Sequence, residues 1–447
     1  MPFNYRLKNL TLAFGSLALT YSALELIVPY FLNHIPLTMY NALQTETRVL
    51  GQSSKDSVIP KNYIALVGDS YAQGRGDWLK KIIKNNRYKG TNPDYYSGHI
   101  IYRKTGIDVI TYGMGGAGSV KGLVTAPIIP HLYINSLWPY TLAQPKHIFV
   151  YFYEGNDFTD NSLYYTNRFL FKGYDENYFF KGYDAKLFYT PLYFDQYLQE
   201  EALERYPSYK NDSSFRHMIF TGLMIAGWNN LKKEIERGIK KFKSLSSFNE
   251  KSSETFTKQK SIQTLKVSLD IQPKPNSSPK NIAIINEKKI TLPAYLQGPP
   301  ITLSPKQIKK SVYIFERSLL FMARFFSQSK ISIIYIPGPA SIYSMAGPNV
   351  SYEAAGWSGE RGRITSKEEI SRVSLESCKK IYGVTKKNGF HFLDLRFYFR
   401  ERAKTKILHG PEDYQHFNRT GQNLLAELII KHIVSNSQNQ KSNTCKE

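Results

Sequence analysis

Residues 63–70 read YIALVGDS, a short apolar run followed at once by a glycine, an aspartate and a serine. Apolar side chains at every position of Tyr63–Val67 are typical of a strand buried on both faces, as in a parallel sheet. Gly68 allows the backbone to turn sharply after such a strand. Ser70 is then expected at the carboxyl end of a parallel strand, where open α/β sheets bind their ligands. Taken alone, the tripeptide is more often an ordinary turn in which Ser70 caps a helix.

Apolar runs of the same kind recur along the chain and alternate with segments of helical periodicity. This alternation predicts an α/β protein with a doubly wound parallel sheet. Further strands are expected at Ile107–Tyr112, His147–Tyr153, Ile331–Ile336 and Phe392–Leu395, and helices at Gln307–Ser327, Ser366–Lys387 and Thr420–Val434.

A long middle segment interrupts this rhythm and divides the predicted α/β domain into two halves. Thr159–Tyr209 is dense in Tyr and Phe, and Leu245–Pro300 is rich in Ser, Lys, Asn and Pro. We expect Leu245–Pro300 to be a flexible surface insertion, because its composition can bury little apolar surface. The predicted organisation is an anchor and connector at 1–60, half of the α/β domain at 61–160, an aromatic and basic insertion at 161–303, the other half at 304–436 and a polar tail at 437–447.

Leu10–Leu32 form an apolar stretch of 23 residues in which Glu25 is the one charged residue. A helix of about 20 apolar residues spans the hydrocarbon core of a bilayer. Arg6 and Lys8 precede the stretch, and no Lys or Arg follows it until Arg48. The positive-inside rule therefore predicts a cytoplasmic N-terminus and an extracytoplasmic domain, periplasmic in a bacterium. A cleaved signal peptide and a buried helix are the alternatives, although a signal's apolar region has only roughly 7–15 residues.

The chain is strongly basic, with a formal charge of +23 at pH 7. Such a charge indicates anionic surroundings, which could be nucleic acid, anionic lipid head groups or an acidic polymer. The predicted location and the lack of a recognition motif argue against nucleic acid. The chain has two cysteines, Cys378 and Cys445, and no CxxC or Cys/His cluster, so we expect no structural metal. Their pairing is left open, and the position of Cys445 beside the end of the chain argues against a disulfide.

A glycine-rich turn, GMGGAG at 113–118, follows the second predicted strand. It matches the GxGxxG pattern of dinucleotide sites, which requires an acidic residue about 20 positions later for the ribose. No Asp or Glu occurs between Asp108 and Glu154, and Pro127 and Pro130 are expected to break the helix that would face the phosphates. A turn whose backbone N–H groups serve an oxyanion fits better, so no cofactor is expected.

Two further polar clusters carry side chains suited to acyl-transfer chemistry. Glu154–Asp157 follow the third predicted strand, and the Asn156 carboxamide there can donate to an oxyanion. Gly-Asn-Asp is also well suited to an ordinary turn. Asp413 precedes His416 by three positions, so its carboxylate can orient the imidazole as a general base for a serine. A surface histidine before a helix is the plain alternative.

The conjunction of the four blocks resembles the SGNH hydrolase superfamily, also called GDSL-like esterases. In that family the blocks contribute a Ser, a Gly, an Asn and a His, with an Asp in a DxxH motif. The matching stretches here are VGDSYAQGRGD, YGMGGAG, YEGND and EDYQHFNRTGQ, and they carry Ser70, Gly115, Asn156 and the pair Asp413 and His416.

The resemblance implies a flavodoxin-like parallel sheet and a catalytic triad of Ser70, His416 and Asp413. It also implies an oxyanion hole made by the N–H groups of Ser70 and Gly115 and by the Asn156 side chain. Gly115 is the best match for the glycine role and Gly113 is an alternative, although the family often has Asn where Gly113 stands. The 257 positions between Asn156 and Asp413 far exceed a minimal domain of the family.

The function implied by the resemblance is that of an extracytoplasmic serine ester hydrolase, for example a carbohydrate O-deacetylase. Its expected partners are an ester-bearing substrate such as an acylated polysaccharide and, through Leu10–Leu32, the membrane. An O-acyltransferase of cell-surface polysaccharide would use the same residues, with a sugar hydroxyl as acceptor. A scaffold that keeps a hydrolase fold without activity is the third possibility, against which the complete Ser–His–Asp set argues.

Overall fold

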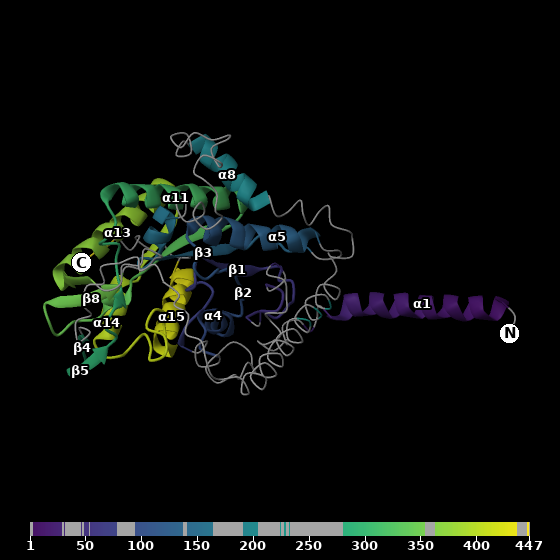
Figure 1. The fold of residues 1–447 in the computed structure, drawn as a ribbon, viewed down its shortest axis with the longest axis horizontal. Helices are drawn as coiled ribbons and strands as arrows, with labels where there is room; N and C mark the ends of the chain where they lie inside the picture. Colours follow the sequence, from purple (N-terminus) through teal and green to yellow (C-terminus); the bar gives the residue numbers. More distant parts are fainter. Residues whose placement is uncertain are drawn as a thin grey trace, which may run out of the picture.

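Five parallel strands form one central sheet, in the order β10-β7-β3-β1-β2, in the computed structural model of the chain (Figure 1). Counted along the chain, this is the 2-1-3-4-5 order of doubly wound sheets. Each predicted strand is present, with bounds within one residue of those expected. The strands are β1 (Tyr63–Val67), β2 (Asp108–Thr111), β3 (His147–Tyr153), β7 (Lys330–Ile336) and β10 (His391–Asp394).

The structure describes most of the α/β domain and only parts of the other segments. Most of the aromatic stretch, residues 245–279 and most of the polar tail lie outside the described residues. Those described are 3–28, 31, 46, 49–52, 54–77, 94–136, 141–163, 191–203, 224, 228, 232, 280–353, 363–435, 445 and 446.

Two hydrophobic cores lie on opposite faces of the sheet, because successive side chains of a strand point to opposite sides. Tyr63, Ala65 and Val67 of β1 enter one core, and Ile64 and Leu66 enter the other. Helices cover both faces, with α5, α8, α11 and α13 above the sheet and α4, α14 and α15 below it in Figure 1. This burial on both faces explains why the strands read as continuous apolar runs.

The helices start and end close to the expected positions. Ser304 caps α11 in a reciprocal capping box with Gln307, and Ser366 accepts a hydrogen bond from the Glu369 amide at the start of α13. The helices are α1 (Phe3–Ile27), α4 (Ser97–Thr105), the π-helix η2 (Val120–Thr125), α5 (Ala126–Ser136), α8 (Pro191–Leu203), α11 (Pro305–Phe325), α12 (Pro339–Ile342), α13 (Lys367–Lys387), α14 (Arg396–Ala403) and α15 (Arg419–Ser435).

The expectation that Pro127 and Pro130 break the helix after the glycine turn is wrong. The π-helix η2 runs directly into α5, and Pro130 lies inside α5. Pro127 lies at the junction of the two helices, as the second residue of α5. A widened π turn is a known means of accommodating irregular backbone within a helix. The second argument against a dinucleotide, the missing acidic residue, does not depend on these prolines.

The expectation that all of Leu245–Pro300 is a flexible surface segment is also wrong for its last part. Strands β4 (Asn281–Ile285) and β5 (Lys288–Leu292) form an antiparallel hairpin. Ala283 and Leu292 of this hairpin are buried in the core below the central sheet. The alternation of apolar and polar residues is the strand signal that the basic composition obscured. A second small sheet joins β6 (Leu296–Gln297), β8 (Asn349–Glu353) and β9 (Arg363–Ser366).

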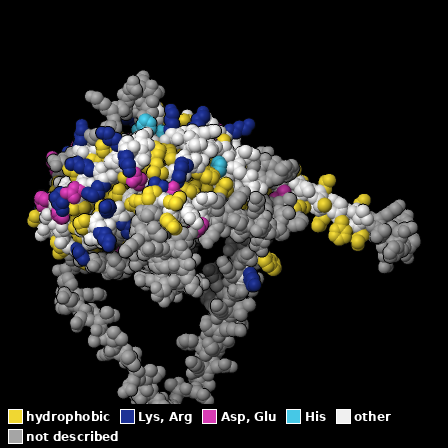
Figure 2. Space-filling model, turned by 90° about the horizontal axis from the view of Figure 1, so that it is seen from above, with side chains coloured by type: hydrophobic (Ala, Val, Ile, Leu, Met, Phe, Trp, Pro, Cys, Tyr) yellow, Lys and Arg dark blue, Asp and Glu magenta, His cyan; other side chains and the backbone are white. Residues whose placement is uncertain are grey.

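The N-terminal helix α1 projects from the α/β domain (Figure 1). Its stretch Asn9–Ile27 is long and apolar enough to cross a membrane, with a mean hydropathy of 1.5, and none of it is buried against the rest of the chain. Hydrophobic side chains are therefore exposed along the helix (Figure 2), as Leu12 illustrates at 77%. The helix α1 ends at Ile27, and the last part of the expected Leu10–Leu32 segment lies largely outside the described residues.

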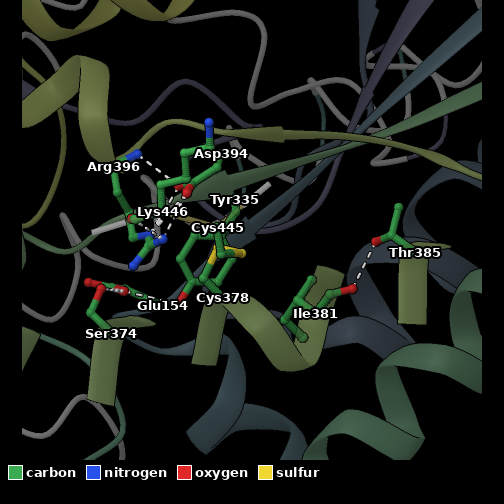
Figure 3. The surroundings of a disulfide bond; sticks show 10 residues. All are labelled: Glu154, Tyr335, Ser374, Cys378, Ile381, Thr385, Asp394, Arg396, Cys445 and Lys446. Carbon is green, nitrogen blue, oxygen red and sulfur yellow. Dashed lines mark hydrogen bonds and ion pairs between the residues drawn. A yellow bond between two sulfur atoms is a disulfide. The ribbon is translucent and has the colours of Figure 1, made fainter. Parts of the chain in front are cut away.

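Cys378 of α13 and Cys445 form a disulfide, which the sequence left open (Figure 3). Beside it, the buried Arg396 guanidinium makes a two-pronged ion pair with Asp394 and donates to the Lys446 carbonyl at 3.1 Å. These contacts bring the end of the chain back to the carboxyl end of β10. The position of Cys445 near the end of the sequence argued against pairing, because the sequence does not show that the chain end folds back onto α13.

Candidate active site

Ser70 lies one turn beyond the end of β1, on a loop that also contains residues needed to hold it. Gly68 has a φ of +140°, and a Cβ there would lie 2.7 Å from the Tyr151 carbonyl oxygen, so only glycine fits. The buried Asp69 carboxylate accepts the Tyr71 amide at 2.8 Å and closes the turn. We call residues Gly68–Asp77 the nucleophile loop.

His416 connects Ser70 to Asp413. Its Nε2 lies 2.8 Å from Ser70 Oγ and its Nδ1 lies 2.8 Å from Asp413 Oδ2. A carboxylate can only accept, so Nδ1 carries the proton and Nε2 accepts the Ser70 hydroxyl. All three side chains are largely shielded from water, Asp413 being 4% exposed. This is the arrangement in which an imidazole can remove the proton of a serine.

Two residues of the nucleophile loop attach the loop to the segment that carries His416. Neither was predicted as part of the site. Asp77 Oδ1 accepts the Asp413 amide at 3.0 Å and also the Glu412 amide. The Tyr71 hydroxyl donates to the Gln415 carbonyl at 2.6 Å. Both bonds join positions more than 330 residues apart. Asp77 lies within the stretch VGDSYAQGRGD, but nothing in its local pattern indicates this partner.

The surroundings of the three residues are apolar and aromatic. Tyr71 packs against the His416 ring at 5.3 Å between centroids. His409 is fully buried behind it, and this burial, together with the proximity of His416, lowers the pKa of His409 to about 3. His409 is therefore neutral at physiological pH, and its Nδ1 pairs with the Tyr343 hydroxyl at 3.0 Å.

Asn156 lies after β3, beside the nucleophile loop. Burial raises the pKa of the Asp69 carboxyl, and hydrogen bonds from the Tyr71 amide and the Asn156 side chain counteract this rise. The Asn156 side chain is thus directed at the residue preceding Ser70. Its Oδ1 is buried without a hydrogen-bond partner among the described residues. The neighbouring Asp157 carboxylate accepts the Tyr153 amide at 2.8 Å and fixes the turn.

Glu154, at the start of the same turn, is a further residue that the sequence pattern did not single out. Its carboxylate is 1% exposed and accepts the Gly338 amide at 2.9 Å, the Tyr335 hydroxyl at 3.0 Å and the Ser374 hydroxyl at 2.7 Å (Figure 3). The turn that carries Asn156 is in this way held against β7 and α13. A buried carboxylate with three donors is a stable anchor for such a turn.

The glycine turn after β2 lies against the nucleophile loop. A Cβ on Gly113 would lie 2.0 Å from the Gln73 nitrogen, so this glycine is required for close packing of the two turns. The Gly115 amide donates to Gln73 Oε1 at 3.1 Å. The Gly115 amide is therefore occupied by the Gln73 side chain in this structure. Among the described residues, none accepts a hydrogen bond from the Ser70 amide.

One group of potential metal ligands occurs in the part of the chain that the structure describes, Cys378, Asp394 and Cys445. The two sulfurs are joined in the disulfide and so are not available as thiolates.

Comparison of the chain with known protein families, with curated proteins and with solved structures finds no match.

Proposed function

We propose that this protein is a membrane-anchored serine ester hydrolase of the SGNH type. The observation that carries the proposal is the His416 imidazole, whose two nitrogens lie 2.8 Å from Ser70 Oγ and 2.8 Å from Asp413 Oδ2. Residues from opposite ends of the α/β domain meet here at the carboxyl edge of the sheet, where doubly wound folds bind ligands.

In the proposed reaction His416 Nε2 removes the Ser70 proton while Ser70 Oγ attacks the carbonyl carbon of an ester. The imidazolium that forms is stabilised by the Asp413 carboxylate and then protonates the departing alcohol. Water, deprotonated by the same imidazole, attacks the acyl-serine, and the imidazolium returns its proton to Ser70 Oγ as the carboxylic acid is released. If a sugar hydroxyl attacked in place of water, the acyl group would be transferred to the sugar.

The oxyanion formed in each step needs donors that are in place before reaction. The Ser70 amide, the Asn156 side chain and, after movement of Gln73, the Gly115 amide are the proposed donors. Each such donor typically lowers the barrier by about 3 kcal/mol.

We further propose that α1 lies in the membrane, with the N-terminus cytoplasmic and the α/β domain outside the cytoplasm. The disulfide supports this location, because disulfides persist mainly in oxidising compartments. An acylated cell-surface polysaccharide is accordingly the proposed substrate. A reporter enzyme fused after Val434 tests the orientation: activity of a reporter that works only in the cytoplasm would contradict it.

Labelling of the full-length protein in detergent with a fluorophosphonate probe, followed by peptide mass mapping, tests the proposed activity. We expect the label on Ser70, with none on Ser70→Ala or on heat-denatured wild type. Labelling elsewhere, or none, would contradict the hydrolase and transferase proposals together. If Ser70 is labelled but ester hydrolysis is slow, added sugar acceptors should accelerate release of the acyl group.

A further inference from the structure

An oxygen atom of the protein occupies the position beside the proposed oxyanion donor. Gln73 Oε1 accepts two hydrogen bonds, from the Gly115 amide at 3.1 Å and from Arg75 Nε at 2.9 Å. The Gln73 and Arg75 side chains are both exposed. Both belong to the nucleophile loop, in which the Arg75 amide donates to the Ser70 carbonyl at 3.0 Å. A substrate oxygen that displaced the Gln73 carboxamide would meet the same two donors.

The Arg75 guanidinium lies directly over the glycine turn. A Cβ on Gly115 would be 2.4 Å from Arg75 Cζ and 2.6 Å from one Nη atom, so a larger residue would push the guanidinium away. The positive charge therefore lies beside Gly115, whose amide is a proposed oxyanion donor. The main-chain hydrogen bond from the Arg75 amide to the Ser70 carbonyl keeps the Arg75 backbone close to Ser70.

Arg75 has no carboxylate partner within the described part of the chain, in contrast to other arginines. Arg317 pairs with Asp195, Arg372 with two glutamates of α13, and Arg396 with Asp394. A guanidinium is a planar fork of donors that matches a carboxylate in two-pronged geometry. The Nη groups of Arg75 are suited to such a ligand.

Several acidic residues lie near the proposed site, and two of those that the structure describes cannot offset the Arg75 charge at the surface. Asp69 and Asp157 are buried. Burial, followed by the charge of Asp69, raises the pKa of Asp160 to about 7. Asp69 and Asp157 are thus kept from solvent, whereas the Arg75 side chain is exposed. The net charge of +23, with Lys and Arg spread over the face shown in Figure 2, adds long-range attraction for an acidic polymer.

We infer that the substrate carries a carboxylate close to its ester, and that Arg75 binds this carboxylate and determines specificity for it. The inference rests on the proposed function and narrows its substrate to esters on an acidic, carboxylate-bearing carrier. Gln73 occupies the site in the absence of substrate and moves aside when the carboxylate and ester arrive.

The test compares two nitrophenyl acetates that differ in one ring substituent. One carries a free carboxylate on the ring, and in the other this carboxylate is converted to its methyl ester. The full-length protein in detergent is assayed for kcat/KM on each. We expect wild type to favour the carboxylate ester and Arg75→Ala to lower that preference about tenfold, as for loss of a charge-assisted pair. Arg75→Glu should reverse it, and Arg75→Lys should retain part of it. Raising the salt to 0.5 M should weaken the wild-type preference, since exposed charges are screened.

Two control variants distinguish binding of the substrate carboxylate from a structural role in the nucleophile loop. Lys386→Ala removes an exposed positive charge near the C-terminal end of α13, at the opposite edge of the sheet, and should leave the preference unchanged. Gln73→Ala should keep it. If Arg75→Ala lowers kcat/KM equally on both esters, and Gln73→Ala does the same, the inference about the carboxylate is overturned. The proposed hydrolase activity would not be affected by that result. Absence of Ser70 labelling in wild type would overturn both.

Discussion

Asp77 Oδ1 accepts the main-chain amide of Asp413 at 3.0 Å, although 336 positions separate the two residues. The bond connects the loop that carries Ser70 to the loop that carries His416, and Asp77 is 3% exposed. Their relative position therefore depends on a side chain outside the proposed triad. Such a residue is expected to act by holding the geometry of the other two.

Replacement of Asp77 by Ala should lower kcat about 10- to 100-fold with little change in KM, because a small displacement of the base is costly. The buried amides of Glu412 and Asp413 lose their acceptor, which should also cost about 1–3 kcal/mol of unfolding free energy. Asp77→Asn retains Oδ1 as an acceptor and is the matched control. Equal kcat values for the Ala and Asn variants would contradict a positioning role.

Ser70→Ala and His416→Ala should each abolish hydrolysis of a small activated ester while the thermal unfolding temperature is retained. The double variant should be no slower than either single one, because nucleophile and base act as a unit. Steady-state rates on 4-nitrophenyl acetate with circular dichroism of each variant provide the check. Wild-type turnover by Ser70→Ala would mean that the three residues form a structural network only.

Asn156→Ala should lower kcat by about 10²–10³-fold, as expected for loss of one oxyanion donor. The decrease should appear in kcat more than in KM, since the donor acts on the transition state. Asp413→Asn should retain residual activity through the groups that remain. If Asn156→Ala changes KM alone, the Asn156 side chain binds substrate and does not stabilise the oxyanion.

The buried His147 should make the unfolding free energy fall as the pH is lowered. Burial, followed by the charges of His432, His391 and Lys330, lowers its pKa to about 3. The unfolded chain then binds a proton below about pH 6.5 that the folded chain does not bind until about pH 3, so stability is lost across this window. Urea unfolding measures this loss of unfolding free energy between pH 7 and pH 5. The loss should be about 2 kcal/mol smaller in His147→Gln than in wild type. Equal losses would show that His147 does not titrate in this way.

Removal of the disulfide by Cys445→Ser should lower the unfolding free energy by about 2–4 kcal/mol, as is typical for disulfides. The bridge spans 67 positions. Reduction of wild type by dithiothreitol should produce the same loss, and the variant should not respond to dithiothreitol. A variant as stable as oxidised wild type would show that the contacts of Arg396 hold the chain end without the bridge.

The sequence alone was sufficient to locate the five strands of the central sheet and the residues that follow them, but not the strands of the two smaller sheets. Tyr63–Val67 and His147–Tyr153 are recognisable because a strand buried on both faces is apolar at every position, and this is a local property. The parallel arrangement then brings Ser70 and Asn156 to one edge of the sheet. The spacing of Asp413 and His416 is likewise local, so their contact could be predicted before the fold was known.

Other features were decided by tertiary structure, because their partners are far apart in the chain. Asp77 meets Asp413 because the two halves of the sheet lie side by side, and Cys445 meets Cys378 because the chain end folds back onto α13. Gln73 covers the Gly115 amide because two turns pack together, and Gly113 permits that packing. The hairpin at Asn281–Leu292 joins the fold because its apolar alternate residues find a core beneath the sheet. Local composition indicates none of these contacts, since each depends on side chains brought together by folding.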